Sequence, residues 1–420
     1  MFSTVSSLLT VTAGILVARW LGPAGKGTYS TLALLQGGLT GAIGGVGAAL
    51  TYALTKQQKR LTQLIIPVFL LAVVVTTVSW VGLAIWGRTN SYTSTWLVFF
   101  LTVPAVVVVA WQAYLFMGLG RIRTLNTLSV ARAVLSVGLL YVAVRVLGKG
   151  INGALASWGI VMYANAIAVV AYAALGGPPE RAKAGHEFVQ LFRYGARSGL
   201  GSFLGFLNYR IDSILTLAFL GVAGFGVYSV ATAGSETLYM ISRAVSTASA
   251  HRIGSSALVE SAATTAKAVR TITAIVSAVA VCLGITAPWL VRVLYGDRFQ
   301  TAILPFELLL PGVVAFASGG IFSSFIIYQL GRPAFGVYLT AAVVVLEAAG
   351  CLVLIPRYGM AGAAIASTLT YFLASVGSTW YFCSVAGLRV SDVWIVKRED
   401  LSGIKNVLFG QRAAATSEES

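Results

Sequence analysis

Six charged side chains fall well inside long apolar stretches of the sequence, where charge is rare. They are Arg132, Arg210, Asp212, Glu236, Arg243 and Glu347. One charge at the middle of a bilayer costs at least about 2.5–3.5 kcal/mol on insertion scales, so each should face a partner or a wet cavity. Arginine binds phosphate oxygens through a planar fork, whereas a carboxylate binds a proton, sodium or a cationic compound. The pattern therefore leaves two uses for these charges, which are pairing inside the protein and binding a charged molecule in a cavity.

Spacing along a helix limits which of these charges can meet. Arg210 and Asp212 are two residues apart and point to different sides of a regular helix, so we do not expect them to pair. An ion pair between Asp212 and Arg243 is the structural alternative to a binding role. Glu236 and Arg243 share a helix face, roughly two turns apart. Glu347 either binds a coupling proton or is a buried acid.

The polar residues divide into two groups of candidates. Those expected to contact an anionic ligand are Arg210, Arg132, Arg243 and Asn208. For the arginines, the alternative is that the side chain reaches the membrane interface or pairs internally. Those expected to couple transport to an ion, or to form internal ion pairs, are Asp212, Glu236 and Glu347.

Motifs for catalysis and metal binding are missing from the sequence. It contains no phosphate-binding loop, zinc-protease motif or nucleophile elbow. The three cysteines, Cys282, Cys351 and Cys383, have no metal-ligand spacing and lie in apolar stretches. We therefore expect no cofactor, no metal and no enzyme activity.

The elements that hold these residues are predicted to be membrane-spanning helices. Apolar residues make up 57% of the chain and charged residues 10%, against roughly 25% charged in soluble domains. The apolar stretches are continuous, and about 20 residues cross a bilayer core of about 30 Å. The fold class is thus all-α, a polytopic membrane protein with about twelve transmembrane helices. Their expected positions are 2–19, 28–54, 61–86, 95–118, 126–146, 151–175, 196–219, 225–248, 266–290, 302–329, 333–355 and 359–386.

A polar break with Gly177, Pro178 and Pro179 separates the sixth helix from the seventh. It predicts four parts, namely an N-terminal six-helix lobe at 1–175, a linker at 176–195, a C-terminal six-helix lobe at 196–386 and a cytoplasmic tail at 387–420. Lys and Arg concentrate in the loops after even-numbered helices and in the tail, which places both termini in the cytoplasm. This topology explains much of the net charge of +16, so nucleic-acid binding is not needed to explain it.

The two predicted halves share sequence. Residues 21–30 read LGPAGKGTYS and residues 220–229 read LGVAGFGVYS, with seven of ten positions identical. Leu119, Gly120 and Arg121 recur as Leu330, Gly331 and Arg332; Gly150, Gly153 and Ala154 recur as Gly359, Gly362 and Ala363. Six helices in each half make the repeats parallel, usually around a central cavity that opens to alternate sides. The alternative is a duplicated structural bundle without transport.

Glycines recur every fourth residue in the second predicted helix, at Gly37, Gly41 and Gly45. Small residues at this spacing let two helix backbones approach closely. We favour close packing over the alternative of a helix that bends during transport.

Two segments carry a resemblance to a known family. The run ARWLGPAGKGTY, which contains Arg19, Gly22, Gly25, Gly27 and Tyr29, resembles the ARxLGPxxxGxY signature of polysaccharide flippases. The run NYRID at 208–212 resembles the matching second-half segment, together with Gly221, Gly224, Gly226 and Tyr228. These proteins belong to the multidrug/oligosaccharidyl-lipid/polysaccharide (MOP) exporter superfamily, with a MATE-like fold.

The resemblance implies a flippase of the bacterial inner membrane, active in surface polysaccharide biosynthesis. Its cargo would be an anionic lipid-linked oligosaccharide on undecaprenyl diphosphate, moved outward by alternating access. The implied partners are membrane lipids, a glycan polymerase and glycosyltransferases, without nucleic acid. Two alternatives are a small-molecule, multidrug-type exporter of the same fold and a membrane enzyme of polysaccharide assembly.

The distribution of acids favours the anionic cargo. The first acidic residue in the chain is Glu180, so the first half contains Lys and Arg but no Asp or Glu. A cation-coupled drug exporter would be expected to keep a carboxylate there. The alternative is that the basic residues are all loop anchors at the membrane surface.

Overall fold

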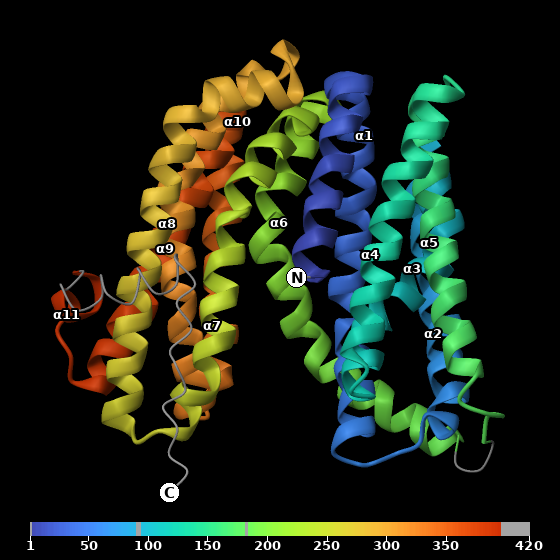
Figure 1. Ribbon diagram of the computed structural model, residues 1–420, viewed down its shortest axis with the longest axis horizontal. Coiled ribbons are helices and arrows are strands. Elements are labelled where there is room, and N and C mark those ends of the chain that lie inside the picture. The colour runs from blue at the N-terminus through green and yellow to red at the C-terminus, as the bar shows by residue number, and fades with distance from the viewer. Residues whose placement is uncertain (1, 90–93, 181–183, 396–420) are drawn as a thin grey trace, which may run out of the picture. The chain divides into compact units, whose positions relative to one another are not determined.

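The computed structural model describes residues 2–89, 94–180 and 184–395, and every regular element among them is a helix (Figure 1). The elements are α1 (Phe2–Thr55), α2 (Leu61–Thr89), α3 (Ser94–Gly118), α4 (Ile122–Leu140), η1 (Tyr141–Val146), α5 (Gly150–Ala174), α6 (Ala184–Glu236), α7 (Leu238–Ser255), α8 (Leu258–Tyr295), η2 (Asp297–Ala302), α9 (Ile303–Ser324), η3 (Phe325–Gln329), α10 (Pro333–Ala386) and α11 (Val390–Trp394). The predicted all-α class is confirmed. Residues 396–420, most of the predicted tail, lie outside the described residues.

The described part of the chain contains nine helical stretches long and apolar enough to cross a membrane. Three of these, Val5–Thr55, Ala184–Arg243 and Ala334–Ala386, are 51, 60 and 53 residues long. Each is more than twice the length of about 20 residues that one crossing needs. Each is also divided by one glycine with non-helical backbone, so nine stretches provide nine plus three, or twelve, crossings. The chain is a multi-pass membrane protein, and its described residues provide the expected number of spans.

The loops predicted at 20–27, 220–224 and 356–358 are wrong. The chain stays helical through all three, apart from Gly22 and Gly221 in the first two and Gly359 directly after the third, where φ is 67°, 68° and 59°. A side chain disfavours this backbone region, whereas glycine adopts it readily. One glycine can therefore redirect a helix without a loop, although the surrounding Gly-rich sequence is typical of a turn.

Two helix starts differ most from the prediction. The seventh helix begins at Ala184 and not at 196, and the ninth begins at Leu258 and not at 266. Residues 184–195 mix polar residues with apolar ones such as Leu191, which is buried. Such an amphipathic turn lacks the hydropathy of a membrane span, so hydropathy alone places the helix start too late.

The repeat proposed from sequence extends to the backbone. Three pairs of matched glycines have positive φ, at 67° and 68° (Gly22, Gly221), 68° and 63° (Gly120, Gly331) and 55° and 59° (Gly150, Gly359). Positive φ occurs at only a small set of positions in the described chain. Agreement at all three pairs supports a duplicated architecture.

The chain forms two compact units. Unit 1 comprises Met1–Ser229 with Arg292–Phe299, and unit 2 comprises Val230–Val291 with Gln300–Ser420. In unit 1, α3 packs between α1 and α5, and α4 packs on α1 and α5. In unit 2, α9 packs against α10 and α7. The lobe boundaries drawn from sequence, and a cavity between the lobes, stay predictions.

The predicted glycine stripe of α1 makes close helix contacts within unit 1. A Cβ atom on Gly41 would lie 2.7 Å from the Phe206 side chain. A Cβ atom on Gly45 would lie 2.1 Å from the carbonyl oxygen of Gly195 on α6. The packing interpretation of these glycines is therefore confirmed.

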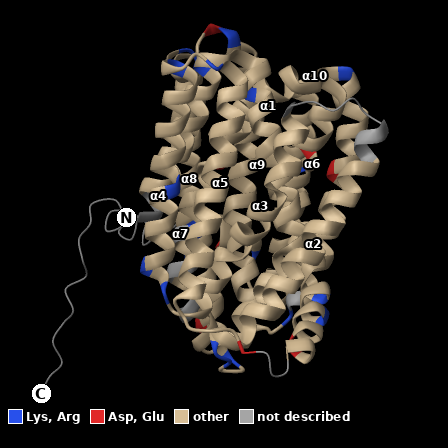
Figure 2. Ribbon diagram, turned by 90° about the vertical axis from the view of Figure 1, so that its right-hand side faces the viewer, with Lys and Arg blue, Asp and Glu red and all other residues tan. Residues whose placement is uncertain are grey.

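Charged residues gather near the ends of the helices, and few colour their middles, in the view of Figure 2. This distribution suits helices whose central portions lie in lipid. The cytoplasmic location of both termini stays a prediction.

Candidate functional site

Arg132 lies close to the signature residue Tyr29, and Lys26 precedes Tyr29 by three residues on the same face of α1. Lys26 is 8% exposed, and its Nζ would lie 3.3 Å from a Cβ atom on Gly14. Arg132, on α4, is half-buried and interacts electrostatically with Tyr29. Tyr29 itself packs against an apolar cluster that α1, α4 and α5 supply, consisting of Ala13, Val17, Leu140 and Ala154. We call Lys26, Tyr29 and Arg132 the cationic cluster.

Sequence reasoning did not predict the burial of Lys26. It placed this residue in a loop, because the GPAGKG run is typical of a turn. In the structure α1 continues through the run, and Lys26 is a buried helical residue four positions after the bend at Gly22. Among the described residues, Lys26 has no hydrogen bond or ion pair, and residues 1–179 contain no acid. The signal that could have found it was its place three residues before Tyr29, on the same helix face.

A buried polar stripe follows one face of α6. Asn208, Asp212 and Thr216 are four residues apart, and they are 6%, 4% and 0% exposed. Spacing of four places all three side chains on the same side of a helix. Thr216 Oγ1 has no hydrogen-bond partner in the described part of the chain. Within the stripe, the Thr216 hydroxyl is therefore a polar group that the described helices leave unsatisfied.

Asp212 is held at the centre of this stripe. Its Oδ2 accepts a hydrogen bond of 2.6 Å from Tyr228 Oη, and its Oδ1 accepts one of 2.5 Å from the Ser213 amide. Arg210 interacts electrostatically with Asp212, although helix spacing predicts that the two side chains point apart. Coulomb attraction acts over several ångströms in a low-dielectric interior and does not require contact.

The two signature segments cross each other within unit 1. A Cβ atom on Gly27 would lie 1.8 Å from the Val222 carbonyl oxygen, and one on Gly226 would lie 2.0 Å from the Pro23 carbonyl oxygen. Gly27 and Gly226 are equivalent in the repeat, as are Pro23 and Val222. The two contacts therefore join equivalent residues in reciprocal order, as a local two-fold relation between the two segments requires.

A hydrogen bond marks the same relation. Ser30 Oγ donates to Ser229 Oγ over 3.1 Å, and these two serines are also equivalent in the repeat. Only glycine leaves room for backbones this close. The signature glycines Gly27 and Gly226 are therefore packing residues at a crossing, and they position Tyr29 and Tyr228 next to it.

The remaining signature residues lie at or near the bends of α1 and α6. Arg19 is exposed and donates from Nη2 to the Val293 carbonyl oxygen at 2.7 Å. A Cβ atom on Gly22 would lie 3.4 Å from Nη1 of Arg298. A Cβ atom on Gly25 would lie 2.3 Å from Cβ of Leu21, and one on the equivalent Gly224 would lie 2.6 Å from Cβ of Leu220.

The other candidates lie in unit 2. Glu236 ends α6, Arg243 is exposed on α7, and Glu347 on α10 is 1% exposed. The structure therefore gathers Arg132, Asn208, Arg210 and Asp212 in unit 1 and the other three in unit 2. The ion pair between Asp212 and Arg243 stays a prediction. No group of three or more His, Cys, Asp or Glu residues able to hold a metal occurs among the described residues.

The arrangement of helices is that of MATE transporters in the MOP superfamily. An inward-facing multidrug resistance MATE transporter matches with a TM-score of 0.75 and 14% identity, covering 91% of this chain and 94% of that one. An outward-facing one matches at 0.64 and 13%, covering 92% and 93%. A MOP transporter from Pyrococcus furiosus, described as having a binding pocket of reverse polarity that suggests a different function, matches at 0.59 and 13%, covering 92% and 93%. Identities this low establish the fold alone.

Residues 16–304 match the family described as polysaccharide biosynthesis protein. This is more than half of the 420 residues, and the chain belongs to that family. No curated protein matches it by sequence. The resemblance to MOP-superfamily polysaccharide proteins is confirmed, and the family and the fold together support a transporter.

Proposed function

We propose that this protein flips an undecaprenyl-diphosphate-linked oligosaccharide across the bacterial inner membrane for surface polysaccharide assembly. The observation that carries the proposal is Lys26, a buried cation with no ion-pair partner among the described residues. It lies in a half of the chain that contains no acid. Burying a charge is costly unless it is paired. A diphosphate on the cargo would supply the missing negative charge.

The chemistry of the cationic cluster suits a diphosphate. The guanidinium of Arg132 can bind two phosphate oxygens at once, and an ammonium such as that of Lys26 binds phosphate as a point charge. The Tyr29 hydroxyl can donate a further hydrogen bond. On α6, Asn208 and Arg210 offer amide and guanidinium donors for the same anion or for the sugar.

The repeat architecture supports movement by alternating access, in which one repeat rocks against the other. Membership of the polysaccharide biosynthesis family supports a glycan cargo over a drug. Membrane lipids, a glycan polymerase and glycosyltransferases are the partners that this role implies.

The test is reconstitution of the full chain in liposomes with a fluorescent lipid-diphosphate oligosaccharide. We expect the wild type to move the lipid between leaflets, and K26Q/R132Q to move it at least about tenfold more slowly. The reason is that one charge-assisted hydrogen bond is worth about 1.5–3 kcal/mol and 1.4 kcal/mol is a factor of ten.

The matched control is R121Q/R123Q, which removes two exposed arginines outside the cationic cluster. It should transport like the wild type. Arg210→Ala should likewise impair transport more than Arg332→Ala, since Arg332 is exposed and contacts Tyr381 Oη at 3.1 Å. No movement by the wild type under any ion gradient, or full activity of K26Q/R132Q, would contradict the proposal.

A small-molecule exporter of the same fold is the second candidate, and Asp212 favours it. A buried carboxylate hydrogen-bonded to Tyr228 could take up a coupling proton or a cationic compound. Efflux of a cationic dye that is lost in Asp212→Asn, with no lipid movement by the wild type, would support this candidate.

A membrane enzyme of polysaccharide assembly is the third candidate, and no observation favours it. It would be supported by a null mutant that alters polymer length while lipid-linked units still reach the outer leaflet.

A further inference from the structure

A second site lies in unit 1, away from the cationic cluster and the α6 stripe. A pocket of about 610 Å³ opens between the end of the long α1 helix and the first turns of α6. Its lining includes Tyr52 and Gln57 from the α1 side and Arg193, Tyr194 and Arg197 from α6. The volume falls in the range of about 300–1,000 Å³ that is typical of small-ligand sites.

The pocket carries excess positive charge. Arg193 and Arg197 are one helical turn apart, exposed, and without a hydrogen bond or ion pair in the described part of the chain. Like charges at this spacing repel each other. An anion placed between them would remove the repulsion and could accept a fork of hydrogen bonds from each guanidinium.

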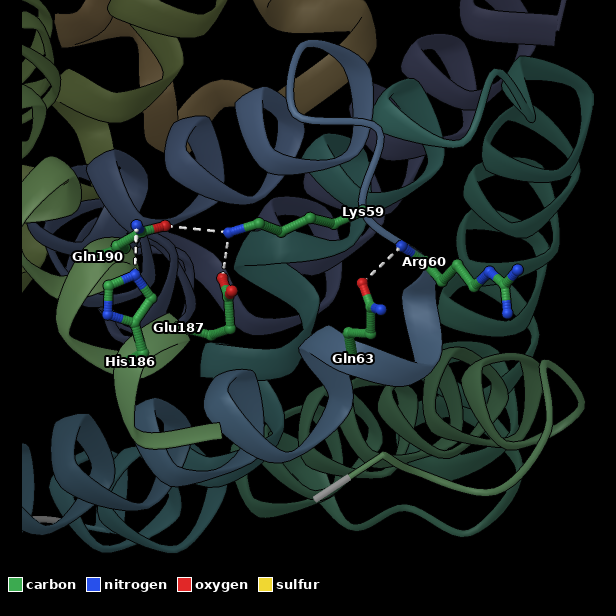
Figure 3. A network of polar contacts seen from close by, with 6 residues as sticks. All are labelled: Lys59, Arg60, Gln63, His186, Glu187 and Gln190. Carbon is green, nitrogen blue, oxygen red and sulfur yellow. Dashed lines mark hydrogen bonds and ion pairs between the residues drawn. The ribbon is translucent and has the colours of Figure 1, made fainter. Parts of the chain in front are cut away.

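The acid in the lining, Glu187, is already engaged (Figure 3). The Lys59 ammonium forms an ion pair with Glu187 and also donates to Gln190 Oε1 at 2.9 Å. Gln190 Nε2 lies 2.8 Å from Nε2 of His186. Lys59 therefore offsets Glu187, and the arginine pair determines the charge of the pocket.

The remaining lining is aromatic and borders apolar surface. The rings of Tyr52 and Tyr194 stack with centroids 5.2 Å apart and planes at 18°. Both tyrosines are exposed, as are the neighbouring apolar residues Val189 and Phe192. Exposed tyrosine and apolar side chains beside arginines are typical of a helix end at the membrane interface.

We propose that this pocket binds the headgroup of an anionic membrane phospholipid. Arg193 and Arg197 hold the phosphate oxygens, while the tyrosine pair packs against the glycerol and the first acyl carbons. Basic pockets between transmembrane helices on the cytoplasmic side take anionic headgroups, and the positive-inside pattern predicts that these helix ends are cytoplasmic. The site is independent of the transported cargo and goes beyond the proposed function.

The test is native mass spectrometry of the full chain in detergent, titrated with dioctanoyl phosphatidylglycerol or dioctanoyl phosphatidylcholine. The wild type should bind phosphatidylglycerol at least about tenfold more tightly than phosphatidylcholine, because two charge-assisted contacts are gained. R193Q/R197Q should lose that preference. The control R121Q/R123Q, which removes two exposed arginines outside the pocket, should keep it.

Three results would overturn the proposal. One is equal phosphatidylglycerol binding by the wild type and R193Q/R197Q at equal melting temperature. Another is displacement of the lipid by millimolar inorganic phosphate, which would make this a site for the free ion. The third is loss in R193Q/R197Q of binding to a fluorescent lipid-diphosphate oligosaccharide, which would assign the pocket to cargo. None of these measurements requires transport, so the lipid site and the flippase role can fail separately.

A second variant separates specific recognition from general charge. R193K/R197K keeps both charges but loses the planar forks. It should bind phosphatidylglycerol with an affinity between those of the wild type and R193Q/R197Q. Wild-type affinity in this variant would show non-specific attraction and would also overturn the site.

Discussion

Tyr29 and Tyr228 occupy equivalent positions in the two repeats and meet opposite charges. Tyr29 lies by Arg132, whereas Tyr228 donates to Asp212. The duplicated backbone thus places the same side chain in both halves, and each tyrosine has a different partner, Arg132 on α4 for Tyr29 and Asp212 on α6 for Tyr228. The first-half tyrosine is suited to an anion, and the second-half tyrosine orients a carboxylate.

Tyr228→Phe should destabilise the protein by about 1.5–3 kcal/mol, the worth of a hydrogen bond to a charged group. Tyr228 is fully buried, so water cannot replace the lost donor. Thermal melting in detergent measures the effect. Tyr358→Phe, which changes an exposed tyrosine, is the control and should melt like the wild type.

A double-mutant cycle identifies the partner of Tyr228. If Asp212 accepts this hydrogen bond, Tyr228→Phe should cost less in an Asp212→Asn background than in the wild type. Additive effects would show that Tyr228 is stabilised by packing and not by the carboxylate.

Glu180 should give stability a dependence on acid pH. Three neighbours lower the pKa of Glu180. The largest effect comes from the hydrogen bond that Thr62 Oγ1 donates to Glu180 Oε1 at 2.6 Å, and a hydrogen bond from Gln63 and the positive charge of Arg60 add to it. Because the pKa of Glu180 is lower in the folded state, its carboxylate stabilises the fold above the ordinary glutamate pKa of 4.5. This stability is lost as the pH falls from there through the folded-state pKa. Glu180→Gln should therefore melt below the wild type at neutral pH.

The pH range makes the effect specific. The difference in melting temperature between wild type and Glu180→Gln should shrink as pH falls below the ordinary glutamate pKa of 4.5. A difference that persists or grows in acid would rule out the carboxylate as its source.

At the scale of helices, one glycine in each of three long helices replaces an expected loop. Gly22 and Gly221 redirect α1 and α6 with nearly the same backbone angles, φ 67° and ψ −170° against φ 68° and ψ −175°. Such angles are essentially confined to glycine. Equivalent bends bring equivalent surfaces together, so Gly27 and Gly226 meet at the crossing.

Gly27→Ala should be severely destabilising, because its methyl group would lie 1.8 Å from a backbone carbonyl oxygen that cannot move aside cheaply. We expect a loss of about 3 kcal/mol or more, the upper end for overpacking. Gly226→Ala should be destabilising to a similar extent, because its methyl group would lie 2.0 Å from the Pro23 carbonyl oxygen. The measurements are the yield of monodisperse protein and thermal melting in detergent.

The matched control is Gly82→Ala on α2, where no atom lies within 4 Å of the added methyl group. It should melt at or slightly above the wild-type temperature, since alanine favours helix over glycine by up to about 1 kcal/mol. Equal behaviour of Gly27→Ala and Gly82→Ala would contradict the close crossing.

At the scale of the whole molecule, duplication and orientation are linked. Six crossings in each half place both halves the same way in the membrane, and the charge bias of the loops predicts which side is cytoplasmic. The proposed lipid site depends on this orientation as well, because anionic lipid is available at the cytoplasmic leaflet.

Lys56→Cys and Lys149→Cys test the orientation. Both positions are exposed, in the connections before α2 and α5. In a variant with the three native cysteines replaced by alanine, a membrane-impermeant maleimide added outside spheroplasts should label only Lys149→Cys. Labelling of Lys56→Cys alone would invert the predicted topology, and the cytoplasmic location of the termini with it.

The sequence by itself determined that this protein lies in lipid and that its two halves are duplicates. Continuous apolar stretches specify helices in lipid, because no other open structure satisfies its backbone there. The LGxAGxGxYS repeat specified that two halves share one architecture, and the structure bears this out in equivalent glycine angles. Asn208, Arg210 and Asp212 were also identified from sequence, since polar residues within apolar stretches need a specific environment.

Tertiary structure decided what the local pattern left open. A Gly-rich run is compatible with a turn or with a bent helix, and only packing against another helix selects between them. For this reason Lys26, predicted in a loop, is a buried cation in the structure. The signature glycines Gly27 and Gly226, also predicted near loops, lie at a helix crossing. The pocket at Arg193 and Arg197 likewise joins residues about 140 positions apart in the chain. Contacts over such separations depend on how helices pack, which short-range sequence patterns do not specify.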